Sequence, residues 1–233
     1  MEKAIFNWSG GKDSSLSLYY LSREPKEFDI RYLVTSVNSQ YNRISMHGVR
    51  QELLEQQAQS IGIPLYMLMV PEMPTMETYN ELMEQTLKKF RKEGIDRSIF
   101  GDIFLEDLKK YREERLARVG FKGVFPIWKI PTKQLVREFI DLGFKAVLAC
   151  VDEKVLDRSF VGRHIDDALL KDLPASVDPC GENGEYHSFV YDGPIFKNPI
   201  AFDFGDVVYR NYTAAAQDPA VHTGFWYCDL IPK

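Results

Sequence analysis

The segment Ser9–Ser14, which reads Ser-Gly-Gly-Lys-Asp-Ser, combines the residue types that bind a phosphate group. Gly10 and Gly11 permit a tight turn and a close approach of the backbone to an anion. Lys12 adds a positive charge, and the hydroxyls of Ser9, Ser14 and Ser15 can donate hydrogen bonds. A helix that began here would add unpaired N–H groups and a favourable dipole. A glycine pair alone could mark a plain turn, but the whole hexapeptide predicts a phosphate site.

A second group of reactive side chains lies in the segment Gly181–Ser188, which reads Gly-Glu-Asn-Gly-Glu-Tyr-His-Ser. Glu182, Glu185 and His187 could transfer protons near neutral pH. A charged hairpin with Asn183-Gly184 as its turn is the structural alternative. That alternative explains the turn but not the two acids and the histidine around it. If the segment continues as a strand, Glu185 and His187 share one face.

Gly101-Asp102 follows an apolar run and gives a third candidate. A carboxylate at the end of a strand could hold Mg²⁺, which would bridge pyrophosphate oxygens. Asp102 could equally cap the helix expected over residues 104–119. Both interpretations stay open. His47 alone would be an ordinary surface or helix-capping histidine.

The cysteines and histidines show no spacing typical of a metal site or a disulfide scaffold. The three cysteines form no CxxC pair, and an odd number leaves one unpaired. The four histidines contain no HExxH pattern. We therefore expect reduced thiols and no zinc site.

Apolar runs alternate with longer amphipathic segments through the first half of the chain. Strands are predicted over residues 3–8, 30–37, 65–70, 98–102 and 122–128, and helices over residues 12–23, 48–61, 75–92 and 104–119. Strands that alternate with helices of this length predict right-handed crossovers and a five-stranded parallel α/β sheet. Ligands of such sheets bind outside the carboxyl ends of the strands, where Ser9–Ser14 and Asp102 are expected.

The pattern changes after Pro131. A helix over residues 133–142 and a strand over 144–151 are followed by short strands over residues 186–191, 201–204, 207–212 and 225–230. We expect a smaller α+β domain over residues 131–233, after a first domain over residues 1–130.

The composition excludes several classes of protein. The 233 residues are 45% hydrophobic and 27% charged, which is ordinary for a globular protein. The net charge of −5 disfavours broad binding to nucleic acid phosphates. The longest apolar runs have six residues, far below the roughly 18–20 that span a bilayer. No secretory signal fits the start of the chain, so a cytoplasmic protein without membrane contact is expected.

Ser9–Ser14 resembles the PP-loop of the N-type ATP pyrophosphatases, whose fold is the adenine-nucleotide α-hydrolase sheet. It matches neither the Walker A loop nor the dinucleotide fingerprint. The resemblance implies that ATP is cleaved between its α and β phosphates, and that Ser9–Ser14 hold the pyrophosphate half. It further implies that adenine lies at the end of the second strand, at Ser36 and Asn38, with Met46 and His47 in the next loop.

The two motifs together resemble the diphthine–ammonia ligase-like branch of that superfamily, in a variant typical of bacterial relatives. The reaction implied is an ATP-dependent amidation: a carboxylate is adenylated, pyrophosphate leaves, and ammonia displaces AMP. ATP and Mg²⁺ would be the cofactors, and the carboxylate acceptor stays open. The implied catalytic residues are Lys12, Glu182, Glu185 and His187; the implied nucleotide-binding residues are Ser9, Gly10, Gly11, Lys12, Asp13, Ser14, Ser15, Ser36, Asn38, His47 and Gly101, with Asp102 for the metal.

Two other functions were weighed against this one. A PP-loop tRNA sulfurtransferase would need paired cysteines and a basic surface, which the sequence lacks. An adenine-nucleotide sensor would explain the glycine-rich loop but leave Gly181–Ser188 without a role. Pyrophosphate release with and without ammonium and candidate carboxylates would separate these functions.

Overall fold

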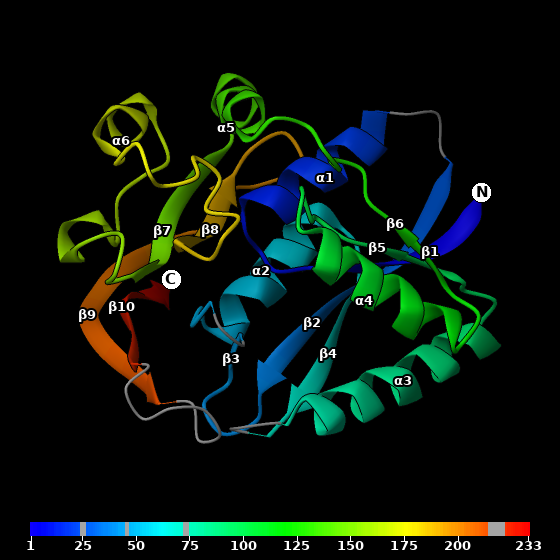
Figure 1. The fold of residues 1–233 in the computed structure, drawn as a ribbon. Helices are drawn as coiled ribbons and strands as arrows, with labels where there is room; N and C mark the ends of the chain where they lie inside the picture. Colours follow the sequence, from blue (N-terminus) through cyan, green and yellow to red (C-terminus); the bar gives the residue numbers. More distant parts are fainter. Residues whose placement is uncertain (24–26, 45–46, 72–74, 214–221) are drawn as a thin grey trace.

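The computed structural model describes residues 1–23, 27–44, 47–71, 75–213 and 222–233 (Figure 1). Two β-sheets, one mostly parallel and one antiparallel, are surrounded by helices. Within the described ranges, no helix is long and apolar enough to cross a membrane.

The first sheet contains five parallel strands, as predicted. They are β1 (Glu2–Asn7), β2 (Phe28–Asn38), β4 (Leu65–Val70), β5 (Arg97–Ile99) and β6 (Lys122–Val124). Their order is β4-β2-β1-β5-β6, and every neighbouring pair is parallel. The two-residue strand β3 (Arg43–Ile44) adds an antiparallel pairing to the end of β2, which the sequence analysis did not predict.

Four helices cover this sheet on both faces (Figure 1). They are α1 (Lys12–Arg23), α2 (Gln51–Ile61), α3 (Met76–Lys92) and α4 (Glu106–Ala117). Alternate residues of β1 explain the two layers, because Phe6 packs in the core shared with α1 and α2 and Ile5 in the core shared with α3 and α4. The strand predicted over residues 122–128 ends at Val124, because a turn follows in which Trp128 N–H donates to the Phe125 carbonyl at 3.2 Å.

The second sheet is antiparallel, in the order β8-β7-β10-β9. Its strands are β7 (Lys145–Asp152), β8 (Tyr186–Asp192), β9 (Phe202–Thr213) and β10 (His222–Pro232). The two strands predicted over residues 201–204 and 207–212 are one strand, β9, with an irregular register opposite Cys228 and Leu230. Helix α5 (Thr132–Asp141) agrees with prediction, whereas α6 (Asp167–Asp172) and the 3₁₀ helix Arg158–Phe160 were not predicted.

One hydrophobic core joins the second sheet to the α1 and α2 side of the first. Buried residues of both parts belong to it, including Leu16 of α1, Leu53 of α2, Phe139 of α5 and Phe189 of β8. Because β8 packs against α1, the segment just before β8 is brought to the start of that helix. The carboxyl end of β1 and the Gly181–Ser188 motif therefore meet.

Candidate active site

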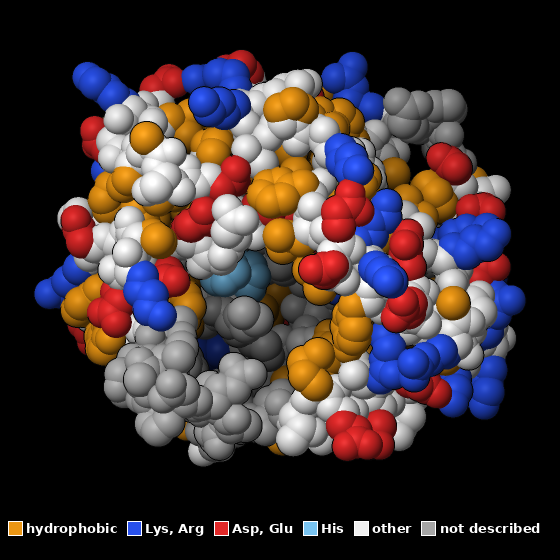
Figure 2. Space-filling model, viewed as in Figure 1, with side chains coloured by type: hydrophobic (Ala, Val, Ile, Leu, Met, Phe, Trp, Pro, Cys, Tyr) orange, Lys and Arg blue, Asp and Glu red, His pale blue; other side chains and the backbone are white. Residues whose placement is uncertain are grey.

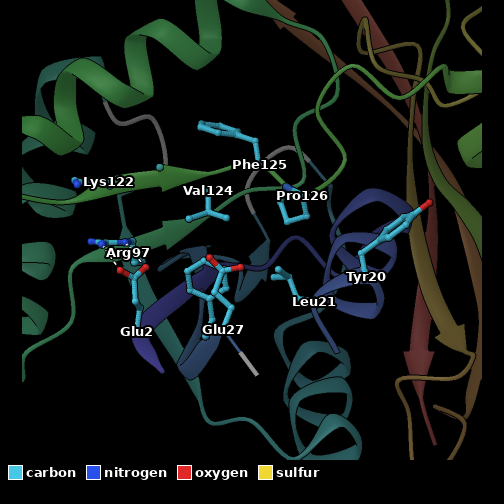
Figure 3. A pocket seen from close by; sticks show the side chains of 11 residues that line it. Glu2, Tyr20, Leu21, Glu27, Arg97, Lys122, Val124, Phe125 and Pro126 are labelled. Carbon is cyan, nitrogen blue, oxygen red and sulfur yellow. Dashed lines mark hydrogen bonds and ion pairs between the residues drawn. The ribbon is translucent and has the colours of Figure 1, made fainter. Parts of the chain in front are cut away.

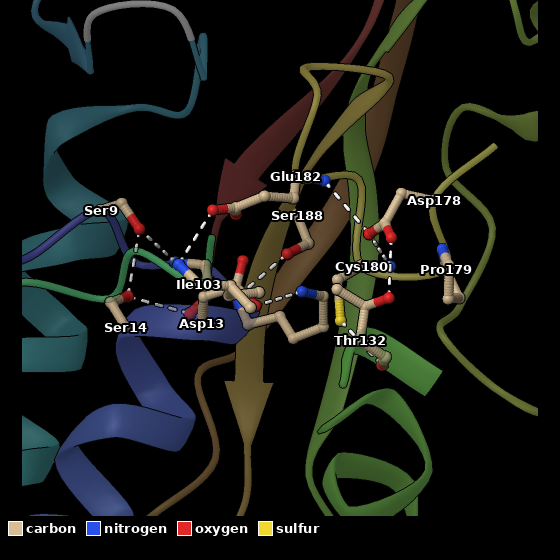
Figure 4. A network of polar contacts seen from close by, with 12 residues as sticks. Ser9, Asp13, Ser14, Ile103, Thr132, Asp178, Pro179, Cys180, Glu182 and Ser188 are labelled. Atoms are coloured by element: carbon tan, nitrogen blue, oxygen red, sulfur yellow. Dashed lines mark hydrogen bonds and ion pairs between the residues drawn. The ribbon is translucent and has the colours of Figure 1, made fainter. Parts of the chain in front are cut away.

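The glycine turn forms the floor of the site. Gly10 has φ 75°, a conformation that favours glycine, and α1 begins two residues later at Lys12. The Ser14 hydroxyl donates to the Gly11 carbonyl at 2.9 Å and lies 3.1 Å from the Ser9 hydroxyl (Figure 4). A Cβ on Gly101 would lie 2.9 Å from the Ser14 nitrogen, so only glycine lets the end of β5 approach the start of α1 this closely.

The Gly181–Ser188 motif lies directly on this turn. The Lys12 backbone N–H donates to the Ser188 hydroxyl at 3.0 Å, across 176 residues of sequence (Figure 4). Two residues further along β8, Val190 N–H donates to the Gly10 carbonyl at 2.9 Å. A Cβ on Gly11 would lie 3.1 Å from the Ser188 carbonyl oxygen. The two motifs that the sequence analysis treated separately therefore form one site.

Gln57 of α2 fixes the geometry between these segments. Its amide nitrogen donates to the Gly10 carbonyl at 3.0 Å and to the Val190 carbonyl at 2.6 Å, and its oxygen accepts from the Trp8 indole at 2.9 Å. The side chain is completely buried. Gln57 was not predicted from the sequence, where its signal is a polar residue between Leu54 and Ala58 on the apolar face of the helix.

Lys12 is buried, with 1% of its surface exposed, and its ammonium forms an ion pair with the Asp13 carboxylate. Burial alone would lower the pKa of Lys12, but the Asp13 charge and hydrogen bond outweigh it and raise the pKa above its usual value. Cys180 and Tyr186 also act on this pKa, so the ammonium lies against the C-terminal motif. The lysine therefore stays charged between the two segments.

Glu182 reaches across to the loop after β5. Its Oε1 accepts hydrogen bonds from the backbone N–H groups of Ile103 at 2.9 Å and Phe104 at 3.4 Å (Figure 4). Burial raises the pKa of Glu182 to about 7, against the opposing effect of these two bonds. A carboxyl group with this pKa exchanges protons at neutral pH.

The Glu185 side chain bonds to neighbouring residues of its own turn. Its buried carboxylate accepts hydrogen bonds from the backbone N–H groups of Asp178 at 3.0 Å and Asn183 at 2.9 Å, and from the Asn183 amide at 3.0 Å. It therefore organises the turn that carries Glu182. Strand β8 begins only at Tyr186, so Glu185 precedes the strand face on which His187 lies.

A second anchor of this turn is Asp178, which the sequence analysis did not single out. Its carboxylate accepts hydrogen bonds from the Thr132 hydroxyl at 2.7 Å and from Cys180 N–H at 2.8 Å (Figure 4). The Cys180 thiol points at the Thr132 carbonyl, 3.2 Å away. These contacts hold the motif against the start of α5.

The His187 ring lies tilted against the His47 ring, with ring centroids 4.4 Å apart and ring planes inclined by 34°. Burial lowers the pKa of His187 to about 4. Burial and the neighbouring His187 also lower the pKa of His47, against a smaller opposing contact with the Ser188 backbone. Both rings are therefore neutral at physiological pH. On the face shown in Figure 2, histidine atoms in pale blue border a hollow near the middle of the molecule.

Asp102 pairs with Arg112 of α4 through contacts of 2.7 and 3.2 Å. It does not cap α4, because the residue at the cap position is Leu105, which makes no side-chain hydrogen bond there. Asp102 does act on the pKa of Asp13, so the two carboxylates lie near each other. Within the described part of the chain, no group of three or more histidine, cysteine or acidic side chains could hold a metal ion.

The end of β2 is shaped by Asn38, whose side-chain oxygen accepts hydrogen bonds from Gln40 N–H at 2.9 Å and Tyr41 N–H at 3.2 Å. Ser36 lies two residues earlier in the same strand and is partly buried. Met46 lies outside the described residues.

Two cavities lie away from the glycine turn. One, of about 500 Å³, is lined by Glu2, Glu27, Arg97 and Lys122 near the amino ends of the strands (Figure 3). Its charged floor is an ion pair between Glu2 and Arg97. The other, of about 470 Å³, is lined by Phe104 and residues 129–133, on the side of Glu182 and Thr132.

Comparison with known proteins gives a consistent result over both halves of the chain. A family model described as diphthamide synthase N-terminal domain matches residues 2–123, and one described as diphthamide synthase C-terminal domain matches residues 131–214. The diphthine–ammonia ligase of Homo sapiens is 26% identical, over 97% of this chain and 91% of that protein. That of Mus musculus is 25% identical, over 89% and 85%. A 95-residue match to the Schizosaccharomyces pombe protein is 30% identical, but covers 39% of this chain and 16% of that one.

Proposed function

The chain belongs to the diphthamide synthase family, and from this premise we propose that it is an ATP-dependent, AMP-forming ligase that makes an amide from a carboxylate and ammonia. ATP would be cleaved to AMP and pyrophosphate, with the carboxylate activated as an acyl-adenylate. The observation that carries the proposal is the contact between the two motifs. A phosphate-binding turn alone would serve a sensor, whereas here Ser188 bonds to that turn and Glu182 bonds to the neighbouring loop after β5.

The phosphate-binding half of the proposal rests on Ser9–Ser14. The glycine turn and the first N–H groups of α1 offer backbone donors, and the charged Lys12 ammonium would stabilise the departing pyrophosphate. The Lys12 N–H is bonded to Ser188, so a phosphate oxygen would compete with or extend that contact. We propose that residues 1–130 bind the nucleotide and residues 131–233 close the site over it.

The second half assigns proton transfer and shielding to the C-terminal motif. Glu182, with a pKa near 7, would exchange a proton with the acceptor or the incoming nitrogen. Glu185 would maintain the turn that positions Glu182, because its three hydrogen bonds all lie within that segment. A site formed between two parts of the chain would protect an acyl-adenylate from hydrolysis by water.

The carboxylates at the turn suit Mg²⁺, which binds oxygen ligands and is commonly held by one or two carboxylates together with substrate phosphates. Asp102 and the neighbouring Asp13 would hold the ion, although Arg112 and Lys12 now pair with them. When bound, Mg²⁺ would neutralise charge on the phosphates. Within the described residues no larger cluster of ligands exists, so the ion would arrive with the nucleotide.

The cysteines argue against the sulfurtransferase alternative. All three are free and buried. Burial raises the pKa of Cys150 and of Cys180 to about 12, so neither would form the thiolate that sulfur transfer needs.

Pyrophosphate release from ATP tests the proposal. The purified protein is incubated with ATP, Mg²⁺, ammonium chloride and a panel of small carboxylates and carboxylate-bearing peptides. We expect release of AMP and pyrophosphate that depends on one acceptor, and exchange of labelled pyrophosphate into ATP in that acceptor's presence. Binding of ATP without turnover under every condition would favour the nucleotide sensor instead.

A further inference from the structure

We propose that the adjacent side chains of His47 and His187 form the ammonia site of this protein, with the imidazole nitrogens accepting hydrogen bonds from the nitrogen donor. The inference rests on the amide-forming function proposed above, and it gives the binding site of one substrate of that reaction, ammonia. It concerns two side chains that come from different parts of the chain, one from the segment before α2 and one from β8.

His47 carries a buried polar atom that no described residue satisfies. Nδ1 of His47 is inaccessible to solvent and has no hydrogen-bond partner among the described residues. A buried polar group without a partner is costly, and its presence calls for an explanation. A neutral imidazole carries one acceptor nitrogen, which suits a small donor such as ammonia or ammonium.

The surroundings of the two rings favour a neutral ligand. The rings lie 4.4 Å apart, so two charged imidazoles would repel each other. No carboxylate or ammonium group among the described residues contributes to the pKa of either ring. The pair therefore offers neutral acceptors rather than a competing cation, and it lacks the carboxylates that would draw in larger cations such as lysine side chains.

The pair lies close to the strand that contacts the glycine turn. His187 precedes Ser188, whose hydroxyl accepts from the Lys12 N–H at that turn, and the Ser188 backbone also contacts His47. The pair thus lies one residue along β8 from the contact between this strand and the turn. On the other side, the Tyr227 ring lies against Gly48, where a Cβ would come within 2.6 Å of it. The segment that carries His47 is therefore held against β10.

The chemistry balances with these groups. Ammonium leaves its extra proton in bulk water, because burial favours neutral ammonia, and an imidazole nitrogen accepts a hydrogen bond from the bound ammonia. The ammonia electron pair attacks the acyl carbon, and the bond from that carbon to the phosphate oxygen breaks, so that AMP leaves with its electrons. The excess proton on the new amide nitrogen passes to an imidazole and from there to solvent. A protonated amide nitrogen is a far stronger acid than imidazolium, so this transfer needs no strongly basic residue.

A salt titration tests the site without ATP or an acceptor. The protein is labelled with ¹⁵N in histidine, and the imidazole signals are followed as ammonium chloride is added at constant pH, with potassium chloride as the matched cation. We expect the signals assigned to His47 and His187 to shift saturably with ammonium and not with potassium. Equal shifts in the two salts, or no saturable shift with ammonium, would overturn the proposal.

A second measurement separates ammonia binding from a structural role. His187→Asn and His47→Asn are compared with His164→Asn, an exposed histidine bonded to Tyr191 away from the site. We expect about a tenfold or greater loss of kcat/KM for ammonium in the first two variants, carried mainly by a raised KM for ammonium, and no such loss in His164→Asn. An unchanged KM for ammonium in the first two variants, or an equal rise in His164→Asn, would contradict the assignment. If the wild type made no amide from any carboxylate, the proposed function would fail, and the salt titration would still decide this one.

Discussion

At the scale of single residues, Lys12 connects the two motifs by charge. Its ammonium is buried, paired with Asp13 and lies against the C-terminal segment, so it can stay charged without contact with bulk water. In the proposed reaction it would exchange part of this pairing for phosphate oxygens. Loss of a charged hydrogen bond typically costs about 1.5–3 kcal/mol.

Lys12→Met, which keeps the length of the side chain, should therefore weaken ATP binding by about ten- to a hundredfold. Isothermal titration calorimetry measures this directly. Lys110→Ala, an exposed lysine of α4, is the control and should bind ATP normally. Unchanged affinity in Lys12→Met, with a normal melting curve, would mean that this loop does not bind the phosphates.

Glu182 gives a prediction for pH. Its folded pKa of about 7 lies above the ordinary 4.5, so between these values the folded state binds more protons than the unfolded state. Stability contributed by this group is therefore lost as the pH rises from about 4.5 to 7. Allowing for its partial exposure, the loss amounts to about 1–2 kcal/mol.

Glu182→Gln should remove this dependence, because glutamine keeps the acceptor oxygen for Ile103 N–H and never ionises. The free energy of unfolding, measured in urea at pH 5 and pH 8, should become less dependent on pH than in the wild type. Glu114→Gln, an exposed change on α4, should leave the wild-type dependence intact. Parallel pH profiles for Glu182→Gln and the wild type would show that the carboxyl group is ionised throughout this range.

At the scale of elements, hydrophobic periodicity and glycines at the ends of helices and strands predicted most of the fold. Helix α1 and strand β4 have the predicted bounds, because a run of one periodicity ends there at a clear turn signal. Short elements such as β3 and α6 were missed, because two to six residues carry too little periodicity. The interruption predicted near Gly205 is only an irregularity in β9, since pairing with β10 continues on both sides of it.

The site was partly predictable from the sequence, because some of its signals are local. Glycine, lysine and acidic residues close together in sequence identified both motifs. Contacts between distant segments could not be read from local spacing, so the bond from Lys12 N–H to Ser188 and the role of Gln57 appear only in the structure. Glu185 illustrates the limit, because a carboxylate beside glycines gives no sign of whether it faces a ligand or its own turn.

The Gln57 side chain bonds to Trp8, Gly10 and Val190 and so connects α2 with the glycine turn and β8. Its removal should therefore destabilise the whole site. Gln57→Leu would leave the Trp8 indole and two backbone carbonyls without their partner, a loss of about 2–4 kcal/mol in the free energy of unfolding. Urea denaturation of the variant measures it. Gln59→Leu, an exposed change on the same helix, should cost less than about 0.5 kcal/mol. Equal stability of the two variants would mean that the buried network contributes nothing net.

At the scale of the whole molecule, the two sheets are joined by a charged contact as well as by the common core. Asp229 of β10 accepts hydrogen bonds from Arg43 of β3 at 2.8 Å and from Arg50, just before α2, at 2.7 and 3.1 Å. These arginines flank the segment that carries His47. The contact therefore fixes one wall of the candidate ammonia site to the second sheet.

Asp229→Asn tests this connection. Burial alone would raise the pKa of Asp229, but its bonds to Arg50 and Arg43 outweigh that effect and lower the pKa to about 2, below the ordinary 3.8. The stabilisation is therefore present above about pH 3.8 and is lost as the pH falls through about 2. Because the carboxylate is partly solvated, we expect about 1 kcal/mol, measured as the difference in unfolding free energy between wild type and variant at pH 7. That difference should shrink as the pH is lowered from 4 to 2.

Asp203→Asn is the control, because the partner of Asp203, Lys233, is exposed. It should change the free energy of unfolding by less than about 0.5 kcal/mol at pH 7 and at pH 2. A difference for Asp229→Asn that stays constant from pH 7 to pH 2 would mean that asparagine disturbs packing at this junction, and that the charge itself does not hold the two sheets together.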